Sequence, residues 1–285
     1  MPTKRRVDTS TDRHHTDPGA RGAPARDPAV VSDLVSAADL LIAAGVAFVA
    51  GVINSIAGGG SLLLFPTLVA LGLPVKAANV TNSVAQWPGY IGGIFGFREE
   101  LVGQRSRILR FSVVAVLGGL AGSIVLLTTS NKAFSIVVPI LVLLASLLLA
   151  VQPLLTRRLR REDTGAGARD PVWVYVALFV AAAYGGYFGG ALGVILVGVL
   201  GTALHRLKLA NALKSVLSAV TATVTVVVFG LFGPVHWLVV AVAAPASLLG
   251  GFAGARVATR IPTTPLRVFI VVFGIAVSVY LFLHG

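Results

Sequence analysis

Long apolar stretches separated by short polar segments make up most of this chain. They cover residues 37–57, 61–73, 77–97, 108–130, 133–155, 172–203, 209–231, 235–255 and 266–283. Most of them are about as long as the roughly 20 residues that a helix needs to cross a bilayer. Lipid accepts only helices or closed barrels, and these stretches lack the alternation of barrel strands. The pattern predicts an all-α, polytopic helical membrane protein.

Composition supports this prediction and removes several kinds of chemistry. The chain is 56% hydrophobic and 12% charged, whereas a soluble domain is about 25% charged. It has no cysteine, which excludes disulfides, thiolate metal sites and cysteine nucleophiles. Residues 1–33 are polar and rich in Asp, Arg, Pro and Thr, so we expect a disordered tail there.

The longest polar break after the tail divides the apolar part into two halves of similar layout. We expect a first transmembrane repeat at 34–155, a basic linker at 156–170 and a second repeat at 171–285. The matching segments are 51–66 with 186–201 and 77–84 with 209–216, which align Asn79 with Asn211 and Ser83 with Ser215. Chance likeness between Gly- and Ala-rich helices is the alternative to a duplication of the kind found in transporters. Each half is predicted to hold one glycine-broken segment and three transmembrane helices.

Positive charge gathers in short loops between the apolar stretches. The basic loops are 98–110, 156–170, 205–208 and 256–267. Cytoplasmic loops are enriched in Lys and Arg, so we assign these loops to the cytoplasmic face of the cell membrane. The same clustering explains the net charge of +12 without a nucleic-acid partner.

Length and charge together predict how the chain crosses the membrane. A continuous helix over 172–203 would be about 48 Å long, against a hydrocarbon core of about 30 Å. The four basic loops share one face if 172–203 enters, breaks at its glycines and returns. For 37–73 two paths stay open. If it doubles back, the halves are inverted and the tail is outside; if it crosses once, the tail is inside. Both paths place the C-terminus outside.

The break in the first half has the composition of a polar site. Gly58, Gly59 and Gly60 follow Asn54 and Ser55 and precede Ser61, inside an apolar region. Backbone outside a helix survives in a membrane only where protein or a water-filled cavity surrounds it. The helix that restarts after the glycines would point its N-terminus at the break, and such an end favours anions. The alternative is a close packing point between helices, which small residues also supply. For the weaker second break, Gly189, Gly190 and Gly193, both interpretations stay open.

A second polar cluster follows each break. Asn79, Asn82, Ser83 and Gln86 are spaced three or four residues apart and share one helix face. Such a stripe is costly in lipid, so we expect it to face the protein interior. The matching face of the second half carries Asn211, Lys214, Ser215 and Ser218. Lys214 could neutralise an anion, or its ammonium could reach the membrane surface.

Titratable residues decide between classes of function. No acidic residue lies deep in an apolar stretch, which disfavours cation transport, because cation carriers keep intramembrane carboxylates. The histidines lie in the tail, in loops or at segment ends, so a nucleophile would lack a base and we predict no enzyme, no cofactor and no metal. A channel-like facilitator of a small polar solute and a non-transport membrane scaffold or enzyme are the alternatives to a carrier.

Residues 50–85 resemble the first-half signature of the TauE/SafE family of membrane permeases. The glycine run, Pro66, the "GLP" at 72–74 and the Thr/Asn/Ser stretch carry the resemblance, and 185–196 is similar to the second-half glycine motif. The second motif departs from the pattern at Ala191, Leu192 and Val194. The resemblance implies a secondary transporter of two related halves that moves sulfite, sulfoacetate or related organosulfur anions. It implies a substrate region that includes Asn54, Gly58, Gly59, Gly60, Pro66, Asn82, Gly189, Gly190 and Gly193. We therefore predict a secondary membrane transporter of a small anion: sulfite, an organosulfonate or another small organic acid.

Overall fold

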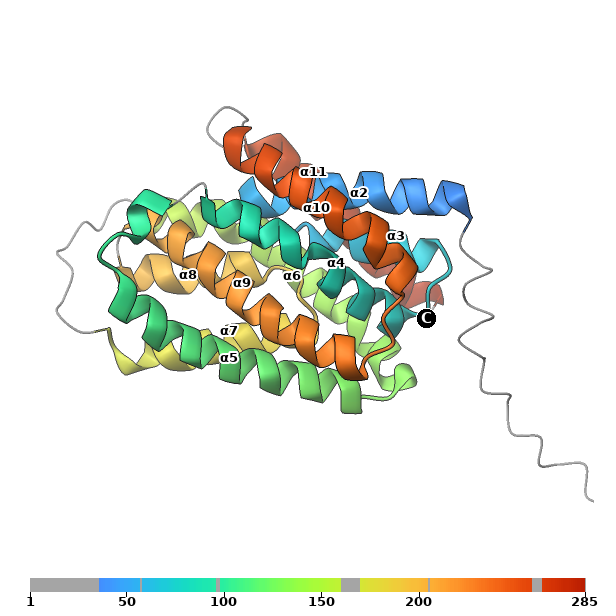
Figure 1. The fold of residues 1–285 in the computed structure, drawn as a ribbon, viewed down its shortest axis with the longest axis horizontal. Helices are drawn as coiled ribbons and strands as arrows, with labels where there is room; N and C mark the ends of the chain where they lie inside the picture. Colours follow the sequence, from blue (N-terminus) through green and yellow to red (C-terminus); the bar gives the residue numbers. More distant parts are fainter. Residues whose placement is uncertain are drawn as a thin grey trace, which may run out of the picture. The chain divides into compact units, whose positions relative to one another are not determined.

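The described part of the chain is helical throughout. The computed structural model describes residues 36–56, 58–95, 98–159, 170–204, 206–257 and 263–284, and these contain no strand. The helices of the first half are α2 (Ala37–Ile56), α3 (Ser61–Ala70), α4 (Val75–Phe95), the 3-10 helix η1 (Arg98–Leu101), α5 (Arg105–Thr128) and α6 (Asn131–Leu159). Those of the second half are α7 (Val172–Tyr187), α8 (Leu192–Leu204), α9 (Leu207–Phe232), α10 (Trp237–Val257) and α11 (Thr263–His284). Figure 1 shows them as one bundle, which confirms the all-α prediction. The predicted disordered tail lies outside the described residues.

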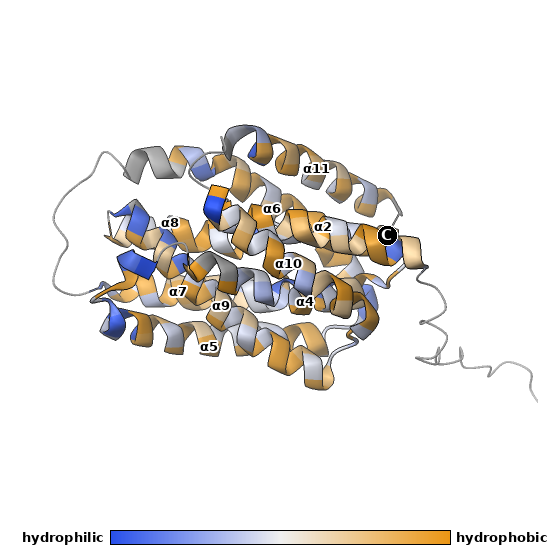
Figure 2. Ribbon diagram, turned by 45° about the horizontal axis from the view of Figure 1, so that its top comes forward, coloured by the Kyte–Doolittle hydropathy of each residue, from blue (hydrophilic) through white to orange (hydrophobic). Residues whose placement is uncertain are grey.

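Within the described residues, six helices are long and apolar enough to cross a membrane: α2, α5, α6, α9, α10 and α11. Their outward faces carry exposed large hydrophobic side chains such as Leu41, Val113 and Phe282, and Figure 2 shows apolar colouring along most of the helices. Water would disfavour such faces, whereas lipid favours them. The described residues therefore form a multi-pass membrane protein. Helices α3, α7 and α8 are apolar but shorter.

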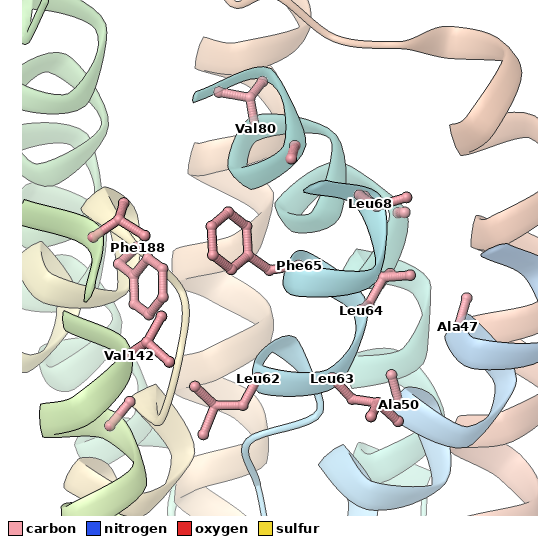
Figure 3. Packing of buried hydrophobic residues seen from close by; sticks show 14 of the residues in the cluster. Ala47, Ala50, Leu62, Leu63, Leu64, Phe65, Leu68, Val80, Val142 and Phe188 are labelled. Atoms are coloured by element: carbon pink, nitrogen blue, oxygen red, sulfur yellow. The ribbon is translucent and has the colours of Figure 1, made fainter. Parts of the chain in front are cut away.

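The first broken segment reverses direction at its glycines. A side chain added at Gly60 would meet the backbone of Ala50, so the start of α3 lies beside the middle of α2. In Figure 3 the chain from Leu62 to Leu68 runs opposite to the chain from Ala47 to Ala50. Helix α3 has 10 residues, or about 15 Å, which is too short to cross. Of the two paths left open by the sequence, this geometry supports the return, and we call α2 and α3 the first hairpin.

The second broken segment also begins and ends on one side of the bundle. Before α7, Asp170 contacts Arg107 at the start of α5, with 3.0 Å between Oδ1 and Nη2. Helix η1, which precedes α5, packs against α9, which follows α8. In Figure 1 the start of α7 and the end of α8 accordingly lie at the same end. This supports the predicted return, and we call α7 and α8 the second hairpin.

The described ends of the basic loops lie together. Arg107 and Arg110 both contact Asp170, and Arg267 of α11 donates to Gln152 of α6 at 3.3 Å. At the other end, Lys76 Nζ donates to the carbonyls of Leu127 and Thr129 at 2.9 and 2.7 Å. We call the first group the basic end of the bundle.

Each half packs a glycine-rich helix against the hairpin of the other half. Gly118 and Gly122 of α5 lie against the α7 backbone at Phe179 and Ala183, and Gly250 and Gly254 of α10 lie against the α2 backbone at Phe48 and Val52. A β-carbon at any of these glycines would collide with backbone. Helices α4 and α9 pack on each other between the two hairpins. The α5–α7 contact of one pair of helices thus has a counterpart in the α10–α2 contact of the other pair.

Candidate functional site

The first hairpin turn needs its three glycines for two different reasons. Gly58 and Gly59 have φ angles of 73° and 101°, a region that L side chains rarely adopt. Gly60 has ordinary backbone angles, but its α-carbon lies against Ala50. The apolar segment therefore breaks at this point because glycine alone allows both the reversal and the close approach.

Buried amide side chains hold this turn in place. The Oδ1 atom of Asn54 accepts a hydrogen bond from the Gly60 amide at 2.8 Å, and its Nδ2 donates to Gln86 Oε1. Gln86 Nε2 donates to Asn82 Oδ1 at 2.6 Å and to Ser61 Oγ at 3.2 Å. We call Asn54, Ser61, Asn82 and Gln86 the amide cluster. Most of its polar atoms bond to other groups of the protein, although Asn82 Nδ2 has no partner among the described residues, so the cluster positions the turn.

The second hairpin turn is held differently. Gly189 has a φ of 77°, and Ala191 has a φ of 57°, the one described non-glycine residue with a positive φ. The ring of Phe188 packs edge-on against Phe65, with 5.5 Å between centroids, and Figure 3 shows both rings between α3 and the second turn. Asn79 Nδ2 donates to the Tyr187 carbonyl at 3.0 Å. Ring packing and this amide support the second turn.

Both turns contain residues with left-handed backbone angles. The φ angles are 73° and 101° at Gly58 and Gly59, and 77° and 57° at Gly189 and Ala191. Two such residues therefore lie in each reversal of the chain.

A small cavity lies between the two turns. We call it the central cavity, and it is lined by Asn54, Ser55, Gly58, Gly59, Gly89, Tyr90, Gly189, Gly193, Lys214, Ser215 and Ser218. Its volume is about 10 Å³, roughly the room that one water molecule needs. A β-carbon at Gly58 would lie 3.5 Å from the Gly193 backbone, so the hairpins close on each other at this point.

Lys214 brings a positive charge to the central cavity. The residue is 5% exposed, and a β-carbon at Gly193 would lie 3.5 Å from its Cδ. Within the described ranges its ammonium has no carboxylate within 4 Å. The buried position of Lys214 beside the central cavity differs from the position expected if its ammonium reached the membrane surface.

The first turn of α8, which borders the central cavity, contains backbone amides without an acceptor. The N–H groups of Leu192 and Gly193 have no acceptor among the described residues. A helix N-terminus carries about half a positive charge and binds anions through such groups. Gly193 and Lys214 both line the central cavity, so the start of α8 and the lysine side chain border the same space.

A second cavity adjoins the first. We call it the hydroxyl cavity, and it is lined by Ser61, Ser83, Tyr90, Gly185, Gly189, Leu192, Thr221, Ala222 and Thr225. Its volume is about 20 Å³. It shares Tyr90 and Gly189 with the central cavity, so these two residues lie between the two spaces.

Most of the residues singled out in the sequence meet around these cavities. The central cavity is lined by Asn54, Ser55, Gly58, Gly59, Gly189, Gly193, Lys214, Ser215 and Ser218, and the hydroxyl cavity by Ser61, Ser83 and again Gly189. Seven line neither cavity: Gly60, Pro66, Asn79, Asn82, Gln86, Gly190 and Asn211. Pro66 is buried inside α3. Gly190 packs against the Phe188 ring and Leu62.

Sequence reasoning missed residues further along the same two helix faces. Tyr90 lies four residues beyond Gln86, and Thr221 and Thr225 continue the face of Lys214 and Ser218. The spacing of three or four residues could have extended both stripes. Among the described residues, no group of His, Cys, Asp or Glu could hold a metal ion.

Comparison with known proteins gives a family match and several similar membrane proteins. Residues 43–281 match the family model described as "Sulfite exporter TauE/SafE". The "Probable membrane transporter protein YfcA" of Escherichia coli K12 is 29% identical over 218 residues, 76% of this chain and 78% of that protein. A "Probable membrane transporter protein" of Haemophilus influenzae is 27% identical over 229 residues, 80% of this chain and 88% of that protein.

A third relative is more distant. The "Probable membrane transporter protein ORF9" of a Sinorhizobium species is 23% identical over 245 residues, 82% of this chain and 89% of that protein. No solved structure matches the chain. Since the family match spans nearly all of the helical region, the chain belongs to the TauE/SafE family of membrane transport proteins.

Proposed function

We propose that the protein is a secondary transporter of a small anion, with the central cavity as its binding site. The observation that carries this proposal is Lys214, a buried ammonium at the cavity without a carboxylate partner in the described chain. An unpaired buried charge is costly, and a bound anion would remove that cost. The free amides at the start of α8 add donors for the same ligand.

The candidate substrates are sulfite, an organosulfonate and another small organic acid. The family description names a sulfite exporter, which supports sulfite. The cavity itself supports a compact acidic group, because glycine backbone forms much of its wall. Ser215 and Ser218 offer hydroxyls beside Lys214.

We also propose alternating access by movement of one half against the other. The volume of the central cavity is about 10 Å³, room for roughly one water molecule, so a bound anion needs the hairpins to separate. The recurrence of the α5–α7 and α10–α2 contacts supports two duplicated halves, 34–155 and 171–285. A channel-like facilitator would need a continuous open path instead.

The basic end is the proposed cytoplasmic face of the cell membrane, following the positive-inside bias. The chain has no cysteine, so single cysteines can report sidedness. Cysteines introduced at Ser106 and Thr264 should both be labelled by an impermeant maleimide from the cytoplasmic side. Labelling of these two positions from opposite sides would contradict the topology.

The function itself is tested by flux into proteoliposomes. Labelled sulfite, ethanesulfonate and acetate are offered with and without unlabelled solute inside. We expect saturable exchange of at least one anion, accelerated by preloading, and loss of this exchange in Lys214→Gln. Lys208→Gln on the same helix, at an exposed position, is the matched control and should keep it. Non-saturable flux without exchange would favour a channel, and absence of any anion flux would contradict the proposal.

A further inference from the structure

We propose that the hydroxyl cavity receives the uncharged end of the substrate. It would then make the transporter select small acids with a hydroxyl tail against the same acids with an ammonium tail. This inference rests on the proposed function, because it takes the acidic group to bind beside Lys214. It adds the hydroxyl cavity to the binding site and assigns recognition of the substrate tail to residues that line this cavity.

The two cavities are arranged as parts of one site. They share Tyr90 and Gly189, and each receives residues from both hairpins and from α4 and α9. Gly189 lacks a side chain at the boundary, and a β-carbon there would lie 3.5 Å from Ser83 Oγ. A ligand anchored at Lys214 can therefore extend past Gly189 once the hairpins separate.

One hydroxyl in the second cavity lacks a partner. Ser83 Oγ donates to the Asn79 carbonyl at 2.9 Å, and Thr225 Oγ1 donates to the Thr221 carbonyl at 2.9 Å. Thr221 is 1% exposed, and its own Oγ1 has no hydrogen-bond partner among the described residues. Buried polar atoms are normally paired. The unpaired Thr221 hydroxyl therefore indicates a ligand group that can form a hydrogen bond with it.

The same cavity is unsuited to a positive charge. No residue that lines it is a carboxylate, and its remaining walls include Gly185, Leu192 and Ala222. An ammonium buried there would be unpaired, which is costly, and it would lie near the Lys214 charge. A hydroxyl avoids both penalties and can pair with Thr221.

The test uses three sulfonates of matched length: 2-hydroxyethanesulfonate, 1-propanesulfonate and 2-aminoethanesulfonate. Their dissociation constants are measured from the thermal stabilisation of the full-length protein, and their flux is measured in proteoliposomes. We expect the hydroxyl compound to bind at least ~10-fold more tightly than the ammonium compound. Thr221→Val should abolish the preference for the hydroxyl over the methyl tail, and Thr221→Ser should keep it.

Controls separate this inference from the proposed function. Ser278→Ala, which removes a buried hydroxyl between α11 and Pro139 of α6, should leave all three ratios unchanged, whereas Lys214→Gln should weaken all three compounds together. Equal binding of the ammonium and hydroxyl compounds, or an unchanged hydroxyl-to-methyl ratio in Thr221→Val, would overturn the inference. Transport of sulfite or acetate without binding of any of the three would overturn the inference and leave the function standing. Failure of every acid to bind or move would overturn both.

Discussion

Both hairpin turns reverse the chain through left-handed backbone angles, but different side chains hold the two turns in place. In the first, Asn54 and Gln86 hold the reversed chain through buried hydrogen bonds. In the second, the Phe188 ring and one bond from Asn79 hold it, and Ala191 keeps a left-handed backbone angle. The comparison shows that buried amides hold one wall of the central cavity, whereas ring packing and a single amide bond hold the other.

The largest effect is expected where the first turn meets α2. Gly60→Ala would place a β-carbon against the Ala50 carbonyl, which backbone can relieve only by moving the whole turn. We expect loss of most folded protein, measured as monodisperse yield after detergent extraction. Gly45→Ala on α2, where a β-carbon meets nothing within 4 Å, is the control and should purify like the parent. Normal yield of Gly60→Ala would show that the turn is not closely packed.

Removing the centre of the amide cluster should come next. Gln86→Leu leaves polar atoms of Asn54 and Asn82 unpaired in a buried place, at about 1–3 kcal/mol for each orphaned group. We expect a clearly lower midpoint of thermal unfolding. Amide hydrogen exchange should rise in residues 54–61 more than in residues 188–193. Equal acceleration in both turns would contradict the assignment of the cluster to the first turn.

The matching change in the second turn should cost less. Asn79→Leu removes one hydrogen bond and leaves one acceptor, the Tyr187 carbonyl, without its donor, at about 1–3 kcal/mol for a single orphaned group against at least two in Gln86→Leu. We expect faster exchange in residues 186–192 and little change in residues 54–61. A destabilisation as large as that of Gln86→Leu would remove the contrast between the turns.

The smallest effect is expected at Ala191. Ala191→Gly relieves the cost of a left-handed alanine, about 1 kcal/mol, and restores backbone freedom to the unfolded chain, which offsets it by a similar amount. The unfolding midpoint should therefore stay within a few degrees of the parent. Ala181→Gly in the buried interior of α7 should be destabilising by comparison. Equal losses in the two variants would argue against strain at Ala191.

Much of the fold could be predicted from the sequence because membrane helices depend on long apolar stretches and on where these break. The path of residues 37–73 could not be, since a reversal and a kink leave the same glycines in the sequence.

The residue types of the site could be predicted from the sequence. Which of these residues line a cavity and which bond to other protein groups could not. Spacing placed Lys214 on an interior face, but it could not show that the ammonium reaches the central cavity. It also could not show that Asn82 and Gln86 bond to protein. Side-chain pairing of this kind depends on tertiary contacts between α2, α3 and α4, which a helix-face pattern does not contain.

The central claim, that Lys214 holds an anion in the central cavity, is tested most directly by binding. The thermal midpoint of the purified protein is titrated with sulfite, ethanesulfonate and acetate, since a ligand of the folded state raises it with concentration. We predict a saturable rise with at least one anion in the parent and in Lys208→Gln, and none in Lys214→Gln. An equal rise in Lys214→Gln would contradict the claim and place the anion elsewhere in the protein.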